Sequence, residues 1–279
     1  MSPQVLFNGG PPPDLSAHRA LHYGDGVFRT CFIYQSYIID IEEQCDLVMA
    51  DAARLGLAPV VGEQLASEAR RLAGGVDRGV LKILLLRAGE ARGYGAAAAA
   101  STDRLLRRYD APPFRAACWE QGVNVARSAL TLASQPALAG IKHLNRLEQV
   151  LASRGWAPGI DEVLLADDAG RPVCGTRTNL FRVVRGTLCT APLDRCGVAG
   201  HMRRKVLALA STLGIASRVQ HGTWDDLLAA DEVFLTNSLI GIWPVAQLET
   251  HRWQAPGPVT RHLLDRLAHP RWLPAGKAA

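Results

Sequence analysis

Residues 140–150 read GIKHLNRLEQV, a string in which a lysine stands directly before an amphipathic helical pattern. The apolar positions of this pattern share one helical face: Leu144, Leu147, Val150 and Leu151. The positive end of a helix dipole disfavours a cation, so Lys142 calls for a reason. One reason is use of its amine as a nucleophile, with a pKa lowered by its surroundings. A solvated lysine at a helix start is the simpler alternative.

The sequence ahead of this string predicts an antiparallel sheet with helices. Strand patterns cover 5–8, 27–33, 38–41 and 80–86. The polar pair Gln35-Ser36 predicts a hairpin turn between the second and third of these strands. Helical patterns cover 46–55 and 64–73, and each ends at a glycine.

The second half of the chain has a similar mixture of elements. Strand patterns cover 123–126, 162–166, 180–184, 188–190 and 232–236. Helical patterns cover 200–213, 224–230 and a last stretch marked by Val259, Leu263 and Leu267. Thr223 and Asp226 have the spacing of a capping box. Strands in clusters with helices between them predict an α+β fold.

Domain boundaries follow from a stretch without periodicity around Pro112-Pro113. We predict an N-terminal α+β domain over 1–112, a linker over 113–122, and a C-terminal α+β domain over 123–279 that carries Lys142. A chain of 279 residues is long enough for two medium domains.

Composition excludes several classes of protein. The chain is 48% apolar and 20% charged, which is typical of a globular fold. No apolar run approaches the ~20 residues of a membrane span. The first 20 residues hold Asp14 and Pro11 to Pro13 where a signal peptide needs an apolar stretch, so we expect a cytoplasmic protein.

Charge and cysteine spacing narrow the possible ligands. The net charge is +5, yet its cations form no basic stripe with interleaved aromatics, which argues against nucleic-acid binding. A mildly positive surface suits a small anionic substrate. The six cysteines form no C-x-x-C pair, so we expect no metal site.

Six segments together resemble one enzyme family. They are YGDGVFRT (23–30), LKILLLRAGEARGYG (81–95), GIKHLNRLEQV (140–150), GTRTNLF (175–181), TAPLDRCGVAGHMR (190–203) and WPV (243–245). Their order and content are similar to the fold-type-IV pyridoxal-phosphate enzymes, which include branched-chain and D-amino-acid aminotransferases and 4-amino-4-deoxychorismate lyase. The resemblance covers nearly the whole chain, and the string at 140–150 is most like the lyase.

The resemblance implies a two-domain α+β fold, pyridoxal 5'-phosphate as cofactor, and a homodimer with the site between the domains. It implies Lys142 as the Schiff-base lysine and Thr30 as a residue that handles a proton on the departing side chain. The implied reaction eliminates pyruvate from aminodeoxychorismate and leaves 4-aminobenzoate for a folate-type pathway. Three positions are implied to bind substrate: Tyr23, Arg92 and Tyr94. An ordinary surface charge is the alternative for Arg92.

The remaining implied site residues bind the cofactor. They are Cys174, Asn179, Val198, Gly200, His201, Met202, Asn237 and Ser238. Backbone amides from Val198 to Met202, at a helix start, suit the phosphate.

Three positions depart from the family pattern. Cys174 stands where the family has a glutamate that keeps the pyridine nitrogen protonated, and a thiol with a pKa of about 8.5 is neutral. Gln44 and Leu47 stand where the family has a His-x-x-Arg that grips the phosphate. His201 replaces an aliphatic residue and is either a new phosphate donor or a capped or solvent-facing histidine.

These departures leave three functions open. A lyase fits a neutral Cys174, because formation of the aromatic ring draws the electrons forward. An aminotransferase acting on a small amino acid lacks that exit. A protein of the same fold with weak or no cofactor binding, and a different ligand, is the third.

Overall fold

A computed structural model describes residues 4–90, 93–95, 100–267, 269 and 270. Contacts divide the chain into two units. Unit 1 comprises Met1–Pro113 and Ile141–Asn145, and unit 2 comprises Phe114–Gly140 and Arg146–Ala279. Each mixes helices with sheet, and the predicted α+β class is confirmed.

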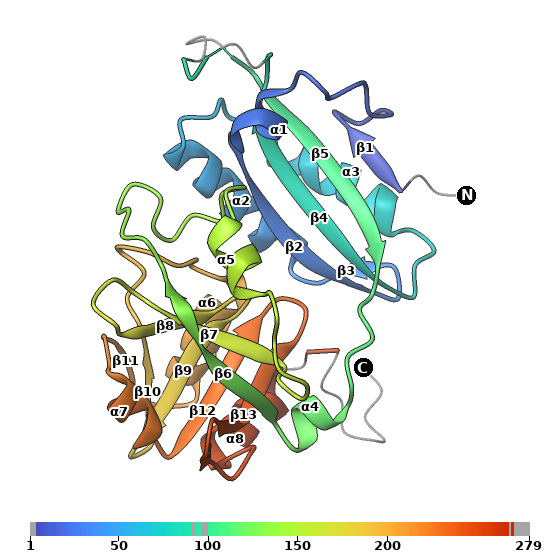
Figure 1. Ribbon diagram of the computed structural model, residues 1–279. Coiled ribbons are helices and arrows are strands. Elements are labelled where there is room, and N and C mark those ends of the chain that lie inside the picture. The colour runs from blue at the N-terminus through green and yellow to red at the C-terminus, as the bar shows by residue number, and fades with distance from the viewer. Residues whose placement is uncertain (1–3, 91–92, 96–99, 268, 271–279) are drawn as a thin grey trace. The chain divides into compact units, whose positions relative to one another are not determined.

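Unit 1 is built on an antiparallel sheet in the order β1-β5-β4-β2-β3. Its strands are β1 (Val5–Phe7), β2 (Gly26–Tyr34), β3 (Tyr37–Ile38), β4 (Arg78–Arg87) and β5 (Thr102–Asp110). Its helices are α1 (Arg19–Tyr23), α2 (Ile41–Arg54) and α3 (Gly62–Ala73). Figure 1 shows α2 and α3 behind the sheet, where alternate residues such as Cys31, Ile83 and Leu106 are fully buried.

Unit 2 contains the remaining elements. Its strands are β6 (Val123–Thr131), β7 (Glu162–Ala166), β8 (Pro172–Gly175), β9 (Asn179–Val184), β10 (Thr187–Thr190), β11 (Ser217–Val219), β12 (Glu232–Asn237), β13 (Gly241–Leu248) and β14 (His251–Arg252). Its helices are α4 (Ala117–Glu120), α5 (Leu147–Ala152), α6 (His201–Thr212), α7 (Trp224–Leu228) and α8 (Pro258–Leu267). The strand order runs β11-β10-β9-β12-β13-β6-β7-β8, and a further β8–β9 pairing closes β9 through β8 into a ring.

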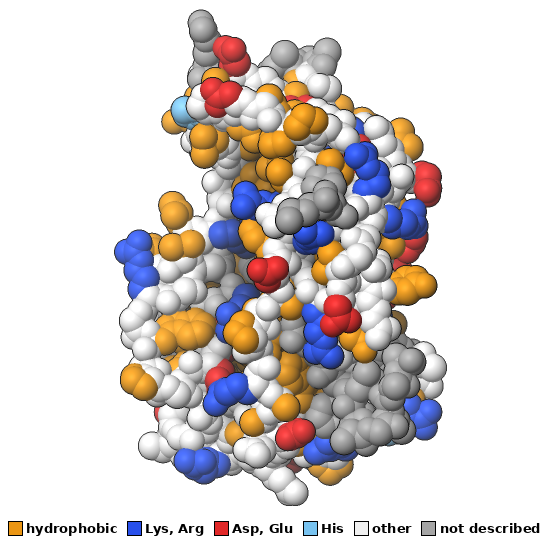
Figure 2. Space-filling model, turned by 90° about the vertical axis from the view of Figure 1, so that its right-hand side faces the viewer, with side chains coloured by type: hydrophobic (Ala, Val, Ile, Leu, Met, Phe, Trp, Pro, Cys, Tyr) orange, Lys and Arg blue, Asp and Glu red, His pale blue; other side chains and the backbone are white. Residues whose placement is uncertain are grey.

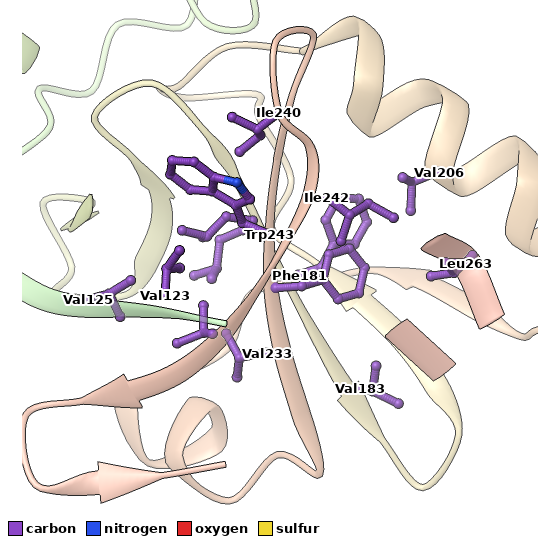
Figure 3. Close-up of a cluster of buried hydrophobic side chains, with 14 of the residues drawn as sticks. Val123, Val125, Phe181, Val183, Val206, Val233, Ile240, Ile242, Trp243 and Leu263 are labelled. Carbon is purple, nitrogen blue, oxygen red and sulfur yellow. The ribbon is translucent and has the colours of Figure 1, made fainter. Parts of the chain in front are cut away.

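Aromatic side chains fill the core of unit 2 on both faces of β13. Figure 3 shows Trp243 beside Val123 and Val125, whereas Ile242 lies with Phe181 near Val206 and Leu263. Neighbouring residues of a strand point to opposite faces, so β13 contributes to two layers of packing. Phe181 stacks on Phe234 with ring centroids 4.9 Å apart.

Most predicted elements are present, with shifted ends. The pattern at 38–41 forms only the short β3, and α2 begins at Ile41 rather than at 46. The capping box at Thr223 and Asp226 is confirmed. Five strands escaped prediction: β5, β8, β11, β13 and β14.

The predicted domain boundaries differ from the contacts at two places. The stretch 113–122, expected as a linker, contains α4, and Cys118 and Trp119 of this helix are buried in the core of unit 2. Lys142, expected in the C-terminal domain, lies in a five-residue segment whose contacts belong to unit 1. The chain on both sides of that segment belongs to unit 2.

On one face of the molecule, the charged side chains are dispersed. On the face drawn in Figure 2, Lys and Arg side chains are spread among acidic and apolar ones rather than gathered in one stripe. Among the helices of the described residues, none combines the length and the apolar character needed to span a membrane.

Candidate active site

The segment that carries Lys142 lies along the edge of β2 in unit 1. Phe28 N–H donates to the Lys142 carbonyl at 2.9 Å, and Leu144 N–H donates to the Gly26 carbonyl at 3.0 Å. Val27 and His143 form an isolated bridge between these two hydrogen bonds. Because β3 pairs only with the far end of β2, this end of the strand has an edge that the lysine segment covers.

A buried carboxylate holds the other side of the lysine backbone. The Lys142 N–H donates to Asp51 Oδ2 at 3.1 Å, and the Arg29 Nη2 donates to the same oxygen at 2.5 Å. Asp51 lies on α2 and Arg29 on β2, and both side chains are buried. Both polar backbone groups of Lys142 are therefore held.

The amine of Lys142 lies over an aromatic ring. Its Nζ is 4.6 Å from the centroid of Phe28. Thr30, two residues further along β2, is on the same face of the strand as Phe28. The structure thus places the two predicted catalytic residues beside one strand.

Lys82 is a second amine at this place, and sequence reasoning missed it. It pairs in register with Thr30, and its Nζ is 4.5 Å from the Phe28 centroid. Burial lowers the pKa of Lys82. Within the described residues no carboxylate pairs with Lys82. The sequence signal that could have identified it is the position of Lys82 inside the apolar run 80–86.

A buried arginine fixes the loop that carries Tyr94. The Arg19 guanidinium donates to the carbonyls of Gly93, Tyr94 and Gly95 over 2.9–3.2 Å. Its Nε donates to Asp25 at 3.1 Å. Tyr94 is exposed, and its ring centroid is 5.3 Å from that of Tyr23, which brings these two predicted substrate residues together. The predicted Arg92 lies outside the described residues.

In unit 2, Cys174 and Asn179 form the pair that closes the ring of strands. They are partners in register between β8 and β9, and Thr236 is the partner of Asn179 on β12. Cys174 is buried among apolar side chains, and this burial raises its pKa to about 12. Its thiol is therefore neutral at physiological pH.

The buried carboxylate near this pair already has partners. Glu162 accepts hydrogen bonds from the Thr176 N–H and Oγ1 and from the Thr178 Oγ1 at 2.6–3.2 Å. It fixes the turn between β8 and β9 and supplies no substitute for the family's glutamate.

The N-terminus of α6 has backbone donors and no acid. Gly200 is its N-cap and makes no side-chain cap, and the first turn contains no acidic residue. The Asn179 Nδ2 donates to the Val198 carbonyl at 2.8 Å. A Cβ on Gly200 would lie 2.3 Å from Asn179 Oδ1, so this position has room only for glycine. His201 and Met202 are buried, and Met202 belongs to the core.

Backbone hydrogen bonds link this loop to the chain just before the lysine. Gly140 N–H donates to the Gly197 carbonyl at 3.1 Å, and Ala199 N–H donates to the Gly140 carbonyl at 2.9 Å. The Asn237 side chain accepts from Leu239 and Ile240 N–H at 2.8 and 3.0 Å, and its Nδ2 donates to the Arg177 carbonyl at 3.2 Å. Ser238 follows it and accepts at its carbonyl from His269 Nε2 at 3.2 Å.

The two positions where the resembled family has its phosphate-binding His-x-x-Arg lie on α2. Gln44 is buried on this helix and Leu47 is half-buried, so neither position offers a cation. In unit 2, the backbone amides at the start of α6 are of the kind that binds a phosphate, and Cys174 is a neutral thiol.

Comparison with known proteins gives concordant matches. The sequence profile of the family Amino-transferase class IV matches residues 26–248. Aminodeoxychorismate lyase of Vibrio harveyi is 31% identical over 257 residues, which cover 89% of this chain and 93% of that protein. D-alanine aminotransferase of Bacillus licheniformis is 27% identical over 282 residues, covering 95% of each.

Solved structures agree with these relatives. The crystal structure of 4-amino-4-deoxychorismate lyase from Pseudomonas aeruginosa superposes with a TM-score of 0.89 at 38% identity, covering 94% of this chain and 97% of that one. The branched-chain amino acid aminotransferase of Escherichia coli shares the fold, with a TM-score of 0.86 at 24% identity and coverage of 96% and 94%.

Proposed function

Because the chain belongs to the class IV aminotransferase family, we propose that it is a pyridoxal-phosphate-dependent aminodeoxychorismate lyase. The observation that carries the proposal is the arrangement around Phe28. The backbone of Lys142 is held by hydrogen bonds, and its amine lies over the Phe28 ring. The amine of Lys82 lies over the same ring, and Lys82 is the register partner of Thr30.

Under this proposal each unit would contribute to holding the cofactor. In unit 1, Lys142 would provide the amine for its aldehyde. In unit 2, the backbone amides at the start of α6, where Gly200 is the N-cap, would provide donors for its phosphate. Cys174 in the same unit provides a neutral thiol. When bound, pyridoxal phosphate supplies an aldehyde for covalent attachment and an electron-withdrawing ring.

The chain's own residues then share the work of elimination. The Lys142 Nζ removes the proton from ring carbon 4 of the substrate, acting as a general base. The bond between the ring and the enolpyruvyl oxygen breaks, and the proton taken up by Lys142 passes, with Thr30 as relay, to the departing group, which leaves as pyruvate. Lys82 pairs with a substrate carboxylate, a role that suits a half-buried ammonium beside which the described residues place no carboxylate.

Cys174 favours elimination over amino transfer. Amino transfer depends on a protonated pyridine nitrogen that holds electrons until a proton returns, and a neutral thiol gives that state no ionic support. Elimination ends in an aromatic ring, so the electrons leave with the product. The relatives include aminotransferases, and transfer of an amino group from a small amino acid is the second candidate.

The test is incubation of the cofactor-loaded protein with aminodeoxychorismate, followed by assay of pyruvate and 4-aminobenzoate. We expect both products in equal amounts, and a loss of about 10²–10⁴-fold in rate for Lys142→Ala. Lys142→Arg is the matched control, because it keeps the charge without the nucleophilic amine. Amino transfer from D-alanine or a branched-chain amino acid to a keto acid, with no release of pyruvate and 4-aminobenzoate from aminodeoxychorismate, would select the second candidate. A protein that stays colourless with added cofactor would contradict both enzyme functions.

We further propose that the enzyme is a homodimer, as the family resemblance implies. Light scattering should then give twice the mass of the chain. A single-chain mass at micromolar concentration would contradict this assembly.

A further inference from the structure

The pairing of Arg29 with Asp51 stands out among the buried ion pairs of unit 1, because it touches the lysine. Asp51 Oδ2 accepts from both the Arg29 guanidinium and the Lys142 N–H. Both side chains are more than nine-tenths buried. A second buried pair, Arg104 with Glu68 at 2.8 Å, joins the same sheet to α3 and makes no contact with Lys142.

We propose that the Arg29–Asp51 pair positions Lys142, and that Asp51 aims the amine by holding the lysine backbone. The inference rests on the proposed function, since it concerns the placement of the reactive amine. Arg29 orients the Asp51 carboxylate, and the carboxylate then accepts the Lys142 N–H. Phe28 N–H holds the Lys142 carbonyl from the other side.

Clamping at both groups fixes the peptide units around Lys142 relative to β2. The side chain has four rotatable bonds, and their freedom opposes any single placement of the amine. With the backbone fixed, only those bonds remain to be ordered when Nζ lies over the Phe28 ring. A loose backbone would add its own freedom and lower the fraction of molecules with the amine in place.

Ion pairs at buried sites also stabilise packing, so the test must separate the two roles. Removing one partner alone leaves a buried charge and is strongly destabilising. Both variants compared therefore carry Arg29→Met. In one, Asp51→Asn keeps an oxygen that accepts the Lys142 N–H. In the other, Asp51→Leu keeps the volume and removes the acceptor.

The first readout is amide hydrogen exchange at Lys142, which needs neither cofactor nor activity. We expect exchange about tenfold or more faster in Arg29→Met/Asp51→Leu than in Arg29→Met/Asp51→Asn. The amide of Ile83, in the core of the same sheet, should differ little between them. Equal exchange at Lys142 in the two variants would overturn the proposal.

The second readout is labelling of Lys142 by pyridoxal phosphate with a mild hydride reductant, followed by mass spectrometry of the peptide. We expect labelling about tenfold slower without the acceptor, restored by the asparagine variant. In steady state kcat should fall while KM stays, because Asp51 touches the lysine rather than the substrate. Labelling and kcat that match in the two variants would also overturn it.

The matched control is Arg104→Met/Glu68→Leu. It removes an equally placed sheet-to-helix pair and should leave exchange and labelling at Lys142 as in the wild type. If this control slows labelling equally, packing explains the effect and positioning is refuted. If wild-type Lys142 takes no label at all, the proposed function fails, whereas the exchange comparison still decides whether Asp51 holds the backbone.

Discussion

Cys174 is a buried thiol at the pair that closes the ring of strands in unit 2. Cys174 has apolar neighbours that raise its pKa to about 12, and the carboxylate of Glu162 already accepts hydrogen bonds from the adjoining turn. At this position the chain therefore has a neutral group across the whole physiological range. Under the proposed function, the product is an aromatic ring that needs little help from the cofactor's ring nitrogen.

Cys174 also predicts how stability changes in alkali. An unfolded thiol releases its proton above pH about 9, whereas the folded one keeps it to about 12. The unfolded state then binds fewer protons, so the free energy of unfolding falls as pH rises through this window. As pH rises, the free energy of unfolding of Cys174→Ala should fall less steeply than that of the wild type, by up to about 1.4 kcal/mol per pH unit. Urea unfolding at pH 8, 9 and 10 measures the two slopes.

The comparison cancels other groups that titrate in alkali, because both proteins contain them. Parallel slopes would show that the folded thiol ionises as easily as the unfolded one. A cavity left by the alanine would lower the variant's free energy of unfolding equally at each pH and leave its slope unaffected.

At the scale of elements, the start of α6 depends on one glycine. Gly200→Ala would place a Cβ 2.3 Å from Asn179 Oδ1 and force this side chain off the Val198 carbonyl. We expect a loss of about 1–3 kcal/mol in unfolding free energy. Affinity for pyridoxal phosphate should fall about tenfold, measured by absorbance titration.

Gly10→Ala is the matched control, because its nearest atom would be 3.9 Å away and its backbone is not in the left-handed region. It should alter neither quantity. Unchanged affinity in Gly200→Ala would show that the α6 N-terminus takes no part in binding the phosphate.

The capping box of α7 gives a second prediction for an element. The Thr223 hydroxyl accepts from Asp226 N–H at 3.1 Å, and the Asp226 carboxylate accepts from Thr223 N–H at 2.8 Å. Thr223→Ala should cost about 1 kcal/mol of unfolding free energy, and Thr223→Ser much less. Denaturant unfolding of both variants tests this, and equal losses would mean that the hydroxyl contributes nothing.

Local patterns predicted the elements whose own sequence carries a clear signal. The apolar runs of β2 and β4 and the Thr223–Asp226 spacing are examples. β5 escaped because its sequence, TDRLLRRYD, is dominated by charges. Arg104 finds Glu68 on α3, and Arg108 finds the Leu72 carbonyl, so tertiary contacts accommodate charges that argue against a strand.

The candidate site, like the fold, was predictable only where the sequence itself carries a signal. Family resemblance identified Lys142 and the positions that hold the cofactor, which remain predictions. Asp51 could not be found from sequence, because it meets Lys142 across 91 positions of the chain. Lys82 needed the strand register that sets it opposite Thr30. Contacts of this kind depend on the fold.

At the scale of the whole molecule, the two units are interleaved along the chain. The segment Ile141–Asn145 lies outside the first 113 residues but belongs to unit 1. It contributes Ile141, a fully buried core residue, and covers the edge of β2. A fragment ending at Pro113 should therefore aggregate, since it loses about 1.5–3 kcal/mol of apolar burial and exposes a strand edge. Size-exclusion chromatography and circular dichroism measure this.

The matched control is the same fragment with residues 140–145 appended through a flexible glycine-serine linker. It should be more soluble and unfold at a higher temperature. Two fragments with the same behaviour would show that unit 1 stands without the lysine segment.

The pairing of β6 with β13 bears on how the protein is made. Val123 is the partner of Val245, so these two strands can pair only after the ribosome has translated the chain through β13. Until then the apolar residues of β6 await a partner that has not been translated. Such a nascent chain is vulnerable to misassembly throughout its synthesis, and its yield in a cell will depend on the chaperones that shield it.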